Sequence, residues 1–442
     1  MDLPFWVATV VFFAAYAMII SEKLHKTVVA IFAASLMLVL RIVEQHEAFH
    51  VEELGVDWNV IILLISMMLI INLMRPTGIF EYIAIRSSKW GRGDPFRIMV
   101  IFAAVTAVLS ALLDNVTTVL LITPAAILIA DALEVDAVPY LISSALASNI
   151  GGTATLIGDP PNLMIASRAQ LTFMDFIINL APIVVVLMIL YLLVMKLIWG
   201  RKLVTRDELK QRIMQMDERE AIKDPDMLRK SLAVLALVLA GFIFHGILHF
   251  QPATIALFGA GLLLLLSRTH EPHHVLSEIE WPTIFFFLGL FIIVGGVVKV
   301  GLIKRMSIQI LELTGGDLFA TSMIVMWFSA IASAVVDNIP YVATMNPLIV
   351  DMARQLWPDL SGVQLLQHPD LMPLWWSLAL GACLGGNATI VGASANVIIV
   401  GLSEKAGRKI SFWKFMAYGT PVMIVTVAVS SLYVWIRYYL LR

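Results

Sequence analysis

The chain has 442 residues, of which 60% are apolar and only 14% are charged, whereas soluble domains have about 45–50% apolar and about 25% charged residues. This composition excludes an ordinary soluble protein, and the net charge of −2 without a basic face disfavours nucleic-acid binding. The single cysteine, Cys383, excludes an intramolecular disulfide and a cysteine-based metal cluster. We therefore expect an all-α polytopic membrane protein whose partner is the lipid bilayer and not nucleic acid.

Apolar runs long enough to cross a ~30 Å hydrocarbon core recur along the whole chain. The first run follows Asp2 and no positive charge, unlike a secretory signal, so we expect it to be a retained span. Two of the runs contain helix-breaking residues and are predicted to be broken helices. The predicted spans are 4–20, 27–43, 58–74, 138–165 (broken), 175–199, 230–249, 252–267, 281–299, 373–402 (broken) and 412–436.

Two further apolar stretches, about 95–130 and about 318–353, each carry an Asp-Asn pair near the middle. The pairs are Asp114-Asn115 and Asp337-Asn338. A carboxylate at the centre of a full span costs ~2.5–3.5 kcal/mol on insertion scales. Two half-helices that meet at a polar tip avoid exposing that group to lipid, so we expect re-entrant hairpins.

The most polar segment, residues 201–229, is predicted to be a linker between a first repeat, 1–200, and a second repeat, 230–442. With this linker in the cytoplasm and both stretches re-entrant, 21 Lys and Arg fall on the cytoplasmic side and 8 on the outside. The excess of inner positive charge supports this topology, with both termini outside. The predicted location is a bacterial or archaeal cytoplasmic membrane.

The two halves of the chain are copies of each other. Asp114-Asn115 matches Asp337-Asn338 at an offset of 223, and Gly151-Gly152 matches Gly385-Gly386 at an offset of 234. Because each half has an odd number of spans, the copies must be inverted in the membrane. Inverted repeats with interrupted helices are typical of secondary transporters.

The breaks in residues 148–162 and 385–396 combine glycines with Thr, Asn and, in the first repeat only, Asp159. Unwound backbone at such breaks frees carbonyls that can coordinate Na⁺ beside hydroxyl and amide ligands. We expect Asp114, Asn115, Thr153 and Asp159 to be able to hold Na⁺. The full set of candidate ion- and substrate-binding residues is Asp114, Asn115, Thr117, Asn149, Gly151, Gly152, Thr153, Thr155, Asp159, Asn162, Asp337, Asn338, Gly386, Asn387, Thr389, Ser394 and Asn396.

The two Asp-Asn tips and the segments Gly-Gly-Thr-Ala-Thr-Leu-Ile-Gly-Asp-Pro-Pro-Asn (151–162) and Gly-Gly-Asn-Ala-Thr-Ile-Val-Gly-Ala-Ser-Ala-Asn (385–396) resemble the ion transporter superfamily. The similarity covers nearly the whole chain. Within this superfamily the chain most resembles the ArsB/NhaD branch, and it is similar to the melanosomal P protein and to citrate-transporter-like permeases. The resemblance implies a homodimer with a scaffold domain and a transport domain that moves as an elevator.

In the related dicarboxylate carriers the tips read Ser-Asn-Thr, and they bind Na⁺ and substrate carboxylate. Here Asp114 and Asp337 stand in place of the serines, and Val116 and Ile339 in place of the threonines. The added negative charge favours binding of a cation or proton over a free anion.

The sequence predicts an ion-coupled secondary transporter of a small ion, and not an enzyme. It has no resident cofactor, and its coupling ion is Na⁺ or H⁺. Na⁺/H⁺ exchange and anion transport are the two forms of this hypothesis, and an arsenite or antimonite efflux permease is an alternative. A passive ion channel is the alternative from another class. Docking of a soluble ATPase subunit on the cytoplasmic face is left open.

Overall fold

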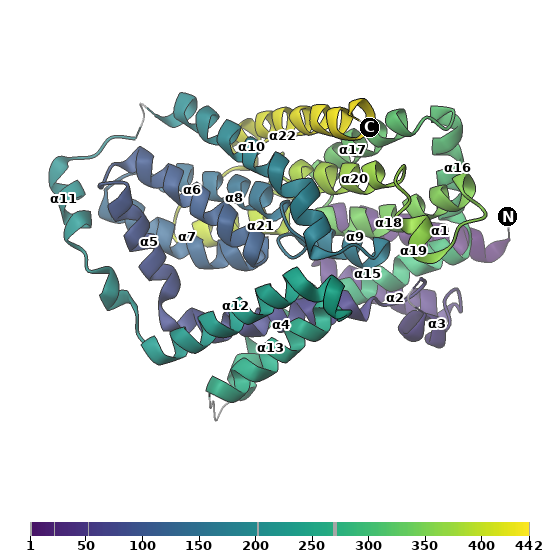
Figure 1. Ribbon diagram of the computed structural model, residues 1–442, viewed down its shortest axis with the longest axis horizontal. Helices are drawn as coiled ribbons and strands as arrows, with labels where there is room; N and C mark the ends of the chain where they lie inside the picture. The colour runs from purple at the N-terminus through teal and green to yellow at the C-terminus, as the bar shows by residue number, and fades with distance from the viewer. Residues whose placement is uncertain (1, 22, 52, 201–202, 268–271, 442) are drawn as a thin grey trace.

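The computed structural model describes residues 2–21, 23–51, 53–200, 203–267 and 272–441. Within these ranges the regular elements are all helical, as the composition predicts. Nine of the described helices are long and apolar enough to cross a membrane. The chain is thus a multi-pass integral membrane protein, and its helices run mainly along the long axis of the molecule (Figure 1).

The first half of the chain forms the elements up to the polar linker. The helix α5 joins the span α4 to the first hairpin. It is amphipathic, and the predicted spans do not include it. The elements are α1 (Leu3–Ser21), α2 (Lys26–Val39), α3 (Gln45–His50), α4 (Trp58–Met74), η1 (Arg75–Thr77), α5 (Ile79–Trp90), α6 (Pro95–Leu112), α7 (Asn115–Ala132), α8 (Val138–Gly152), α9 (Pro160–Ala169) and α10 (Phe173–Trp199).

The rest of the chain forms two short linker helices, α11 and η2, and then repeats the order of the first half. Its own connecting helix, α16, joins the span α15 to the second hairpin. The elements are α11 (Asp207–Gln215), η2 (Glu218–Ala221), α12 (Pro225–Leu248), α13 (Pro252–Ser267), α14 (Pro272–Ser277), α15 (Trp281–Lys299), α16 (Leu302–Thr314), α17 (Leu318–Val335), α18 (Asn338–Leu356), α19 (Gly362–Leu366), α20 (Met372–Gly385), α21 (Ser394–Lys405), α22 (Phe412–Trp435) and η3 (Ile436–Leu440).

The two Asp-Asn stretches form the predicted hairpins, α6–α7 and α17–α18. In the first hairpin, the start of α6 lies against Lys210, because the backbone of Gly93 packs on that residue. The end of α7 lies there too, since Glu134 forms an ion pair with Arg206 at 2.6 Å. In the second hairpin, α17 follows α16 directly and Gln355 near the end of α18 donates to Ser307 of α16 at 2.7 Å. Each pair of arms therefore returns to one end of the molecule.

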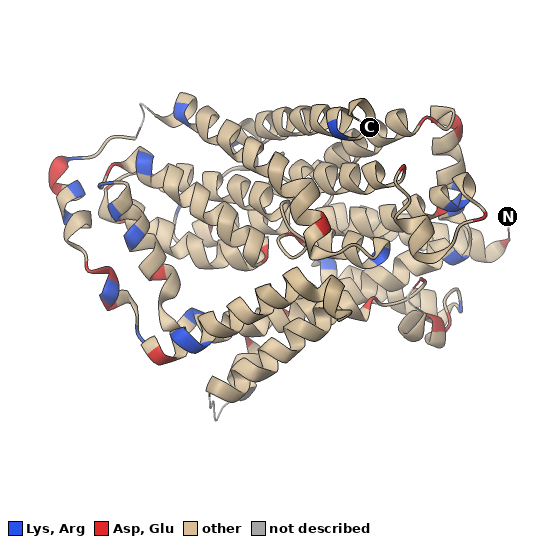
Figure 2. Cartoon of the chain, viewed as in Figure 1, with Lys and Arg blue, Asp and Glu red and all other residues tan. Residues whose placement is uncertain are grey.

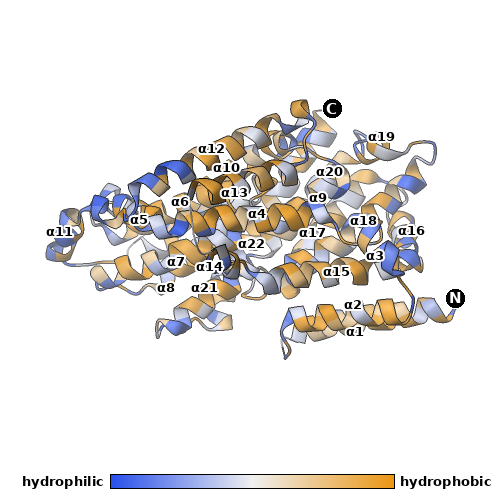
Figure 3. Ribbon diagram, turned by 90° about the horizontal axis from the view of Figure 1, so that it is seen from below, coloured by the Kyte–Doolittle hydropathy of each residue, from blue (hydrophilic) through white to orange (hydrophobic). Residues whose placement is uncertain are grey.

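The first helices of each half pack across the repeats. α2 packs along α15, where the backbone of Gly289 allows close approach to Ala30. The equivalent pair is α4 and α13, and α12 packs on α13. α1 and α2 form an adjacent apolar pair at one side of the molecule (Figure 3). The first helices of the two repeats thus build one shared unit beside the hairpins and broken helices.

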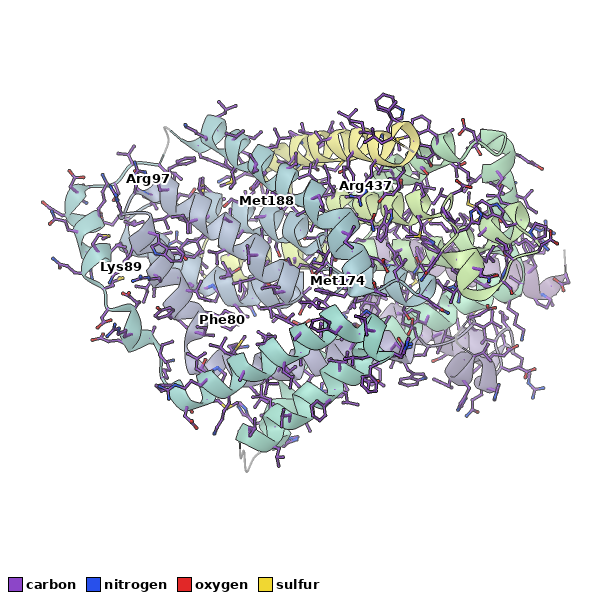
Figure 4. The ribbon with its side chains drawn as sticks, viewed as in Figure 1. Phe80, Lys89, Arg97, Met174, Met188 and Arg437 are labelled. Atoms are coloured by element: carbon purple, nitrogen blue, oxygen red, sulfur yellow. The ribbon has the colours of Figure 1, made fainter. Side chains whose placement is uncertain are left out.

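Charged residues gather at the two ends of the molecule, around α5 and α11 at one end and α16 at the other (Figure 2). Lys89 of α5 and Arg97 of α6 lie at the α11 end (Figure 4). Glu218 of η2 pairs there with Arg86 at 2.7 Å and with Lys89 at 2.5 Å.

The helix α12 begins within the segment predicted to be the linker. α12 begins at Pro225 and includes residues assigned to the linker, because Asp224 caps the amide of Met227. Residues 201 and 202, the first two of the predicted linker, lie outside the described residues.

Candidate functional site

The tip of the first hairpin is a helix start capped by its own carboxylate. Asp114 directly precedes α7, and one carboxylate oxygen accepts the Thr117 amide at 2.8 Å. The other oxygen accepts the Thr117 hydroxyl at 2.5 Å. Capping satisfies an amide that the helix start leaves free. Asp114 is buried yet lines a cavity, so its carboxylate remains available to an ion entering from there.

The tip of the second hairpin has the same cap but a different partner. Asp337 precedes α18, and its Oδ1 accepts the Ile339 amide at 3.4 Å. Its Oδ2 accepts the Lys26 ammonium at 2.5 Å and the Ser394 hydroxyl at 2.7 Å. The two tips are therefore equivalent in sequence but not in charge, because Lys26 neutralises Asp337 and no described basic side chain pairs with Asp114.

The carboxylate of Asp159 lies between the two tips. It is fully buried at the start of α9, and the Asn338 amide donates to both of its oxygens at 3.3 Å. It also interacts with the side chains of Asn115 and Cys383. Among the described residues no basic side chain is seen bonded to it. The sequence analysis groups Asp159 with the first tip, whereas the structure shows that it contacts both.

A chain of amides joins the two repeats at their centre. The Asn149 amide donates to the side-chain oxygens of Asn387 at 3.1 Å and Asn396 at 3.0 Å. The Asn115 amide in turn approaches the Asn149 oxygen at 3.5 Å. These predicted residues come from α7, α8, the second break and α21. The structure thus brings together residues more than 200 positions apart in the sequence, and all four are buried.

Two asparagines that are predicted as ligands stabilise the backbone of the broken helices. The Asn162 amide donates to the carbonyls of Thr153 and Thr155 at 3.2 and 2.9 Å. Asn396 does the same for the carbonyls of Gly386 and Thr389 at 2.7 and 2.9 Å. These bonds satisfy carbonyls that the broken helix leaves unpaired.

The threonine hydroxyls at the breaks donate to backbone carbonyls. Thr155 donates to Ala111 at 2.5 Å, and Thr389 to Ala334 at 2.6 Å, so each break is tied to the first arm of its hairpin. The Thr153 hydroxyl donates to the Asn149 carbonyl at 2.7 Å. A hydroxyl that donates in this way keeps its lone pairs as acceptors.

The glycines at the breaks sit where backbones nearly touch. A side chain on Gly151 would place its Cβ 2.2 Å from the Ala107 carbonyl oxygen, inside the contact between α8 and α6. Gly152 and Gly386 face the backbones of Gly158 and Gly392 across their own breaks. These positions require glycine because a neighbouring backbone occupies the space of a side chain.

Two buried oxygens beside the first tip have no hydrogen-bond partner in the described structure. They are Asn115 Oδ1 and Thr118 Oγ1. Buried polar atoms are normally satisfied, and unpaired oxygens near the Asp114 and Asp159 carboxylates fit a Na⁺ site, since this ion takes oxygen ligands. Thr118 was not among the predicted residues. Its burial one turn into α7 could not be read from the sequence.

A cavity of about 580 Å³ adjoins the two tips. Its charged and polar lining consists of Asp114, Asp337, Lys26, Glu280, His25, Ser394, Thr27 and Thr283. The remaining lining consists of two prolines and of apolar side chains from α1, α4, α7, α18, α21 and the segments between helices. Its volume exceeds that of a bare ion and lies within the range of pockets for small molecules.

The sequence analysis missed two charged groups of this cavity, Lys26 and Glu280. Lys26 was interpreted as a loop charge that marks the cytoplasmic side. Glu280 directly precedes the predicted span 281–299. A charge at the start of an apolar run is the only sequence signal for either residue, and such charges are common at membrane surfaces.

Comparison with known proteins gives consistent matches. The profile of the family described as CitMHS, citrate transporter, matches residues 16–381. An uncharacterized transporter of Mycobacterium tuberculosis is 45% identical over 435 residues, which cover 98% of this chain and 99% of that protein. A 46 kDa membrane protein of Mycobacterium leprae is 43% identical over 433 residues, 98% of each chain. The P protein of Homo sapiens is 31% identical over 510 residues, and the match covers 98% of this chain and 60% of that protein.

Proposed function

The chain belongs to the citrate transporter family of membrane transporters, and from that premise we propose that it is a secondary transporter coupled to Na⁺ or H⁺. The coupling ion binds at the meeting point of the two hairpin tips. Na⁺/H⁺ exchange is the reaction that the charges of the site support best. An arsenite or antimonite efflux permease is the alternative, and it is tested in the same vesicles.

The observation that carries this proposal is the position of Asp159. Its carboxylate is fully buried and is surrounded by amides and a thiol. Burying a carboxylate anion without a compensating cation costs several kcal/mol. Asp159 therefore needs a proton or a bound cation, and a group that must take one or the other is suited to exchanging them.

Asp114 gives the ion a route between this buried position and the cavity. It lines the cavity, whereas Asn115, the next residue, contacts Asp159. Asn115 Oδ1 and Thr118 Oγ1 add two unpaired oxygens. The free backbone N–H groups at the start of α7 point toward the same tip and disfavour a cation there. The two carboxylates must therefore supply the binding energy of the cation. The proposal therefore makes both carboxylates essential.

The elevator mechanism is part of the proposal. Hairpin arms and broken helices pack through backbone contacts, such as Gly151 on α6 and Gly385 on α17. Such contacts favour a rigid unit. The shared unit of α1, α2, α4, α12, α13 and α15 is joined to it by the connecting helices α5 and α16. We place the motion between these two units, with the linker in the cytoplasm and the cavity on the cytoplasmic side.

A second candidate, transport of a small carboxylate anion such as citrate, is favoured by the cavity itself. Its volume of about 580 Å³ exceeds what an ion needs, and Lys26 supplies a positive charge. The three acidic residues of the lining oppose a free polyanion. An anion would therefore need the carboxylates neutralised by bound protons or cations first.

The test uses purified protein in proteoliposomes that contain a pH-sensitive dye. Addition of Na⁺ or Li⁺ outside should change the internal pH, and the rate should saturate with ion concentration. Choline chloride is the control for a salt jump. A Na⁺-dependent pH change that appears without saturation, at rates beyond those of a carrier, would favour a channel.

The second candidate is measured in the same vesicles by uptake of radiolabelled citrate under an imposed Na⁺ or proton gradient. Citrate uptake with no pH change on adding Na⁺ alone would replace exchange by anion symport. Arsenite uptake or efflux under the same gradients would favour the efflux alternative. If none of these ions moves under any gradient, the proposed function is wrong.

A further inference from the structure

Lys26 lies at the second tip, where three other side chains contact its ammonium. It is the first residue of α2, and its ammonium donates to Asp337 at 2.5 Å and to the Ser394 hydroxyl at 2.8 Å. It also lies 5.0 Å from the centre of the Phe286 ring, within the range of a cation–π contact. The positive end of the α2 dipole points the same way and adds to its attraction for a carboxylate. A carboxylate, a hydroxyl and an aromatic face together make a complete site for a cation.

Among the described residues, no such cation is seen bonded to Asp114 at the first tip. α13 is the counterpart of α2, and its first residue, Pro252, carries no charge at the position that Lys26 has in α2. At the offset of 234, the position equivalent to Ser394 is Pro160, which has no hydroxyl. Asp114 instead bonds to Thr117 on its own helix. Within the part of the chain that the structure describes, a basic side chain is thus seen paired with the second tip and not with the first.

We propose that Lys26 is a tethered cation that stands in for a mobile ion at Asp337, so that the chain binds one ion fewer than its two acidic tips would allow. The proposal rests on the proposed function, because it assumes that an acidic tip binds a cation. Lys26 then determines ion specificity and stoichiometry at the second tip. The first tip, with Asp114 and Asp159, remains the place where ions exchange.

The pair also links the two units of the protein. Lys26 belongs to the shared unit, where the neighbouring Thr27 hydroxyl donates to the Pro282 carbonyl at 2.7 Å. Asp337 and Ser394 belong to the hairpin and broken helix. Movement of one unit past the other separates the ammonium from Asp337, which then needs a proton or an ion in its place. Glu280 and Asp114, which line the same cavity, are the acidic groups available to Lys26 after it leaves.

The experiment counts Na⁺ ions bound to the purified, detergent-solubilised protein with radioactive ²²Na⁺ at neutral pH. The variant K26Q removes the tethered charge and should bind one more Na⁺ per chain than the wild type. The double variant K26Q/D337N removes the freed carboxylate as well and should return to the wild-type count. K23Q is the matched control, because Lys23 is an exposed lysine in the same turn, and its count should not change.

A second measurement uses the wild-type chain and does not depend on whether K26Q folds. Lysine amines are acetylated with acetic anhydride, and labelling is followed by mass spectrometry. Lys26 should react more slowly than Lys23, because its ammonium is held by Asp337, and D337N should raise its rate toward that of Lys23. Replacing choline with Na⁺ should leave the labelling of Lys26 unchanged, because the tethered ammonium already occupies the site.

An equal Na⁺ count in K26Q and wild type would overturn the proposal, and so would equal labelling of Lys26 in wild type and D337N. Failure of the proposed function has a different result. In that case wild-type vesicles show no Na⁺-dependent pH change. The extra Na⁺ bound by K26Q would still appear, because the freed site forms whether or not the ion is transported.

Discussion

The amide bridge at Asn149 provides a quantitative test of how the two repeats are held together. N149A removes a donor to two side-chain oxygens, those of Asn387 and Asn396, and both residues are fully buried. Leaving one buried polar group unpaired costs ~1–3 kcal/mol. Two such groups predict a loss of about 2–6 kcal/mol in the free energy of unfolding, on the same mutational scale.

The assay is reversible unfolding in mixed micelles titrated with dodecyl sulfate, for wild type and variant side by side. N59A is the matched control, because the Asn59 side chain, at the start of α4, is seen without a hydrogen bond in the described structure. N59A should remain within about 0.5 kcal/mol of wild type, as surface substitutions usually do. If N149A also remains within that range, the bridge does not hold the repeats together and the reasoning fails.

Two further predictions concern the linker and the packing of the hairpin. The ammonium of Lys89, with the adjacent Arg86, lowers the pKa of Glu218 from its usual value to about 2. Glu218 should thus stabilise the docked linker above pH 4.5 and lose this effect as the pH falls toward 2. Proteolysis of the linker should be faster in E218Q than in wild type at neutral pH, and equal rates there would contradict this assignment. G151A forces a Cβ to within 2.2 Å of the Ala107 oxygen and should destabilise the protein by ~1–3 kcal/mol. The control is G261A, in which nothing lies within 4 Å of the new Cβ, so the free energy of unfolding should not fall. Equal stability of G151A and G261A would show that α8 and α6 can separate.

The fold could be predicted largely from the sequence because lipid imposes simple rules on it. α4, α13 and α15 begin and end where the apolar runs do. The Asp-Asn pairs predicted the hairpin tips, since a carboxylate cannot face lipid at mid-depth. The helices α5 and α16 were missed, because amphipathic helices at a membrane surface lack a long apolar run.

The site was predicted less completely because its contacts join distant positions. The sequence places Asp159 in the first repeat, but only the fold shows that it meets Asn338, 179 positions away. Lys26 and Asp337 are 311 positions apart, and no periodicity connects them. Thr155, Thr389 and Asn162 were predicted as ligands by residue type, and they donate to backbone carbonyls that the breaks leave free. Their roles depend on the shape of the breaks, which residue type does not specify.

The central claim is that the carboxylates at the meeting point of the tips bind the coupling ion. Na⁺-driven pH change in proteoliposomes of D159N and D114N tests this claim most directly. Both substitutions keep the size of the side chain and remove its charge. D94N is the control, because Asp94 caps α6 at an exposed position. We predict that D159N and D114N abolish the pH change, while D94N retains it. A wild-type pH change in either D159N or D114N would contradict the claim.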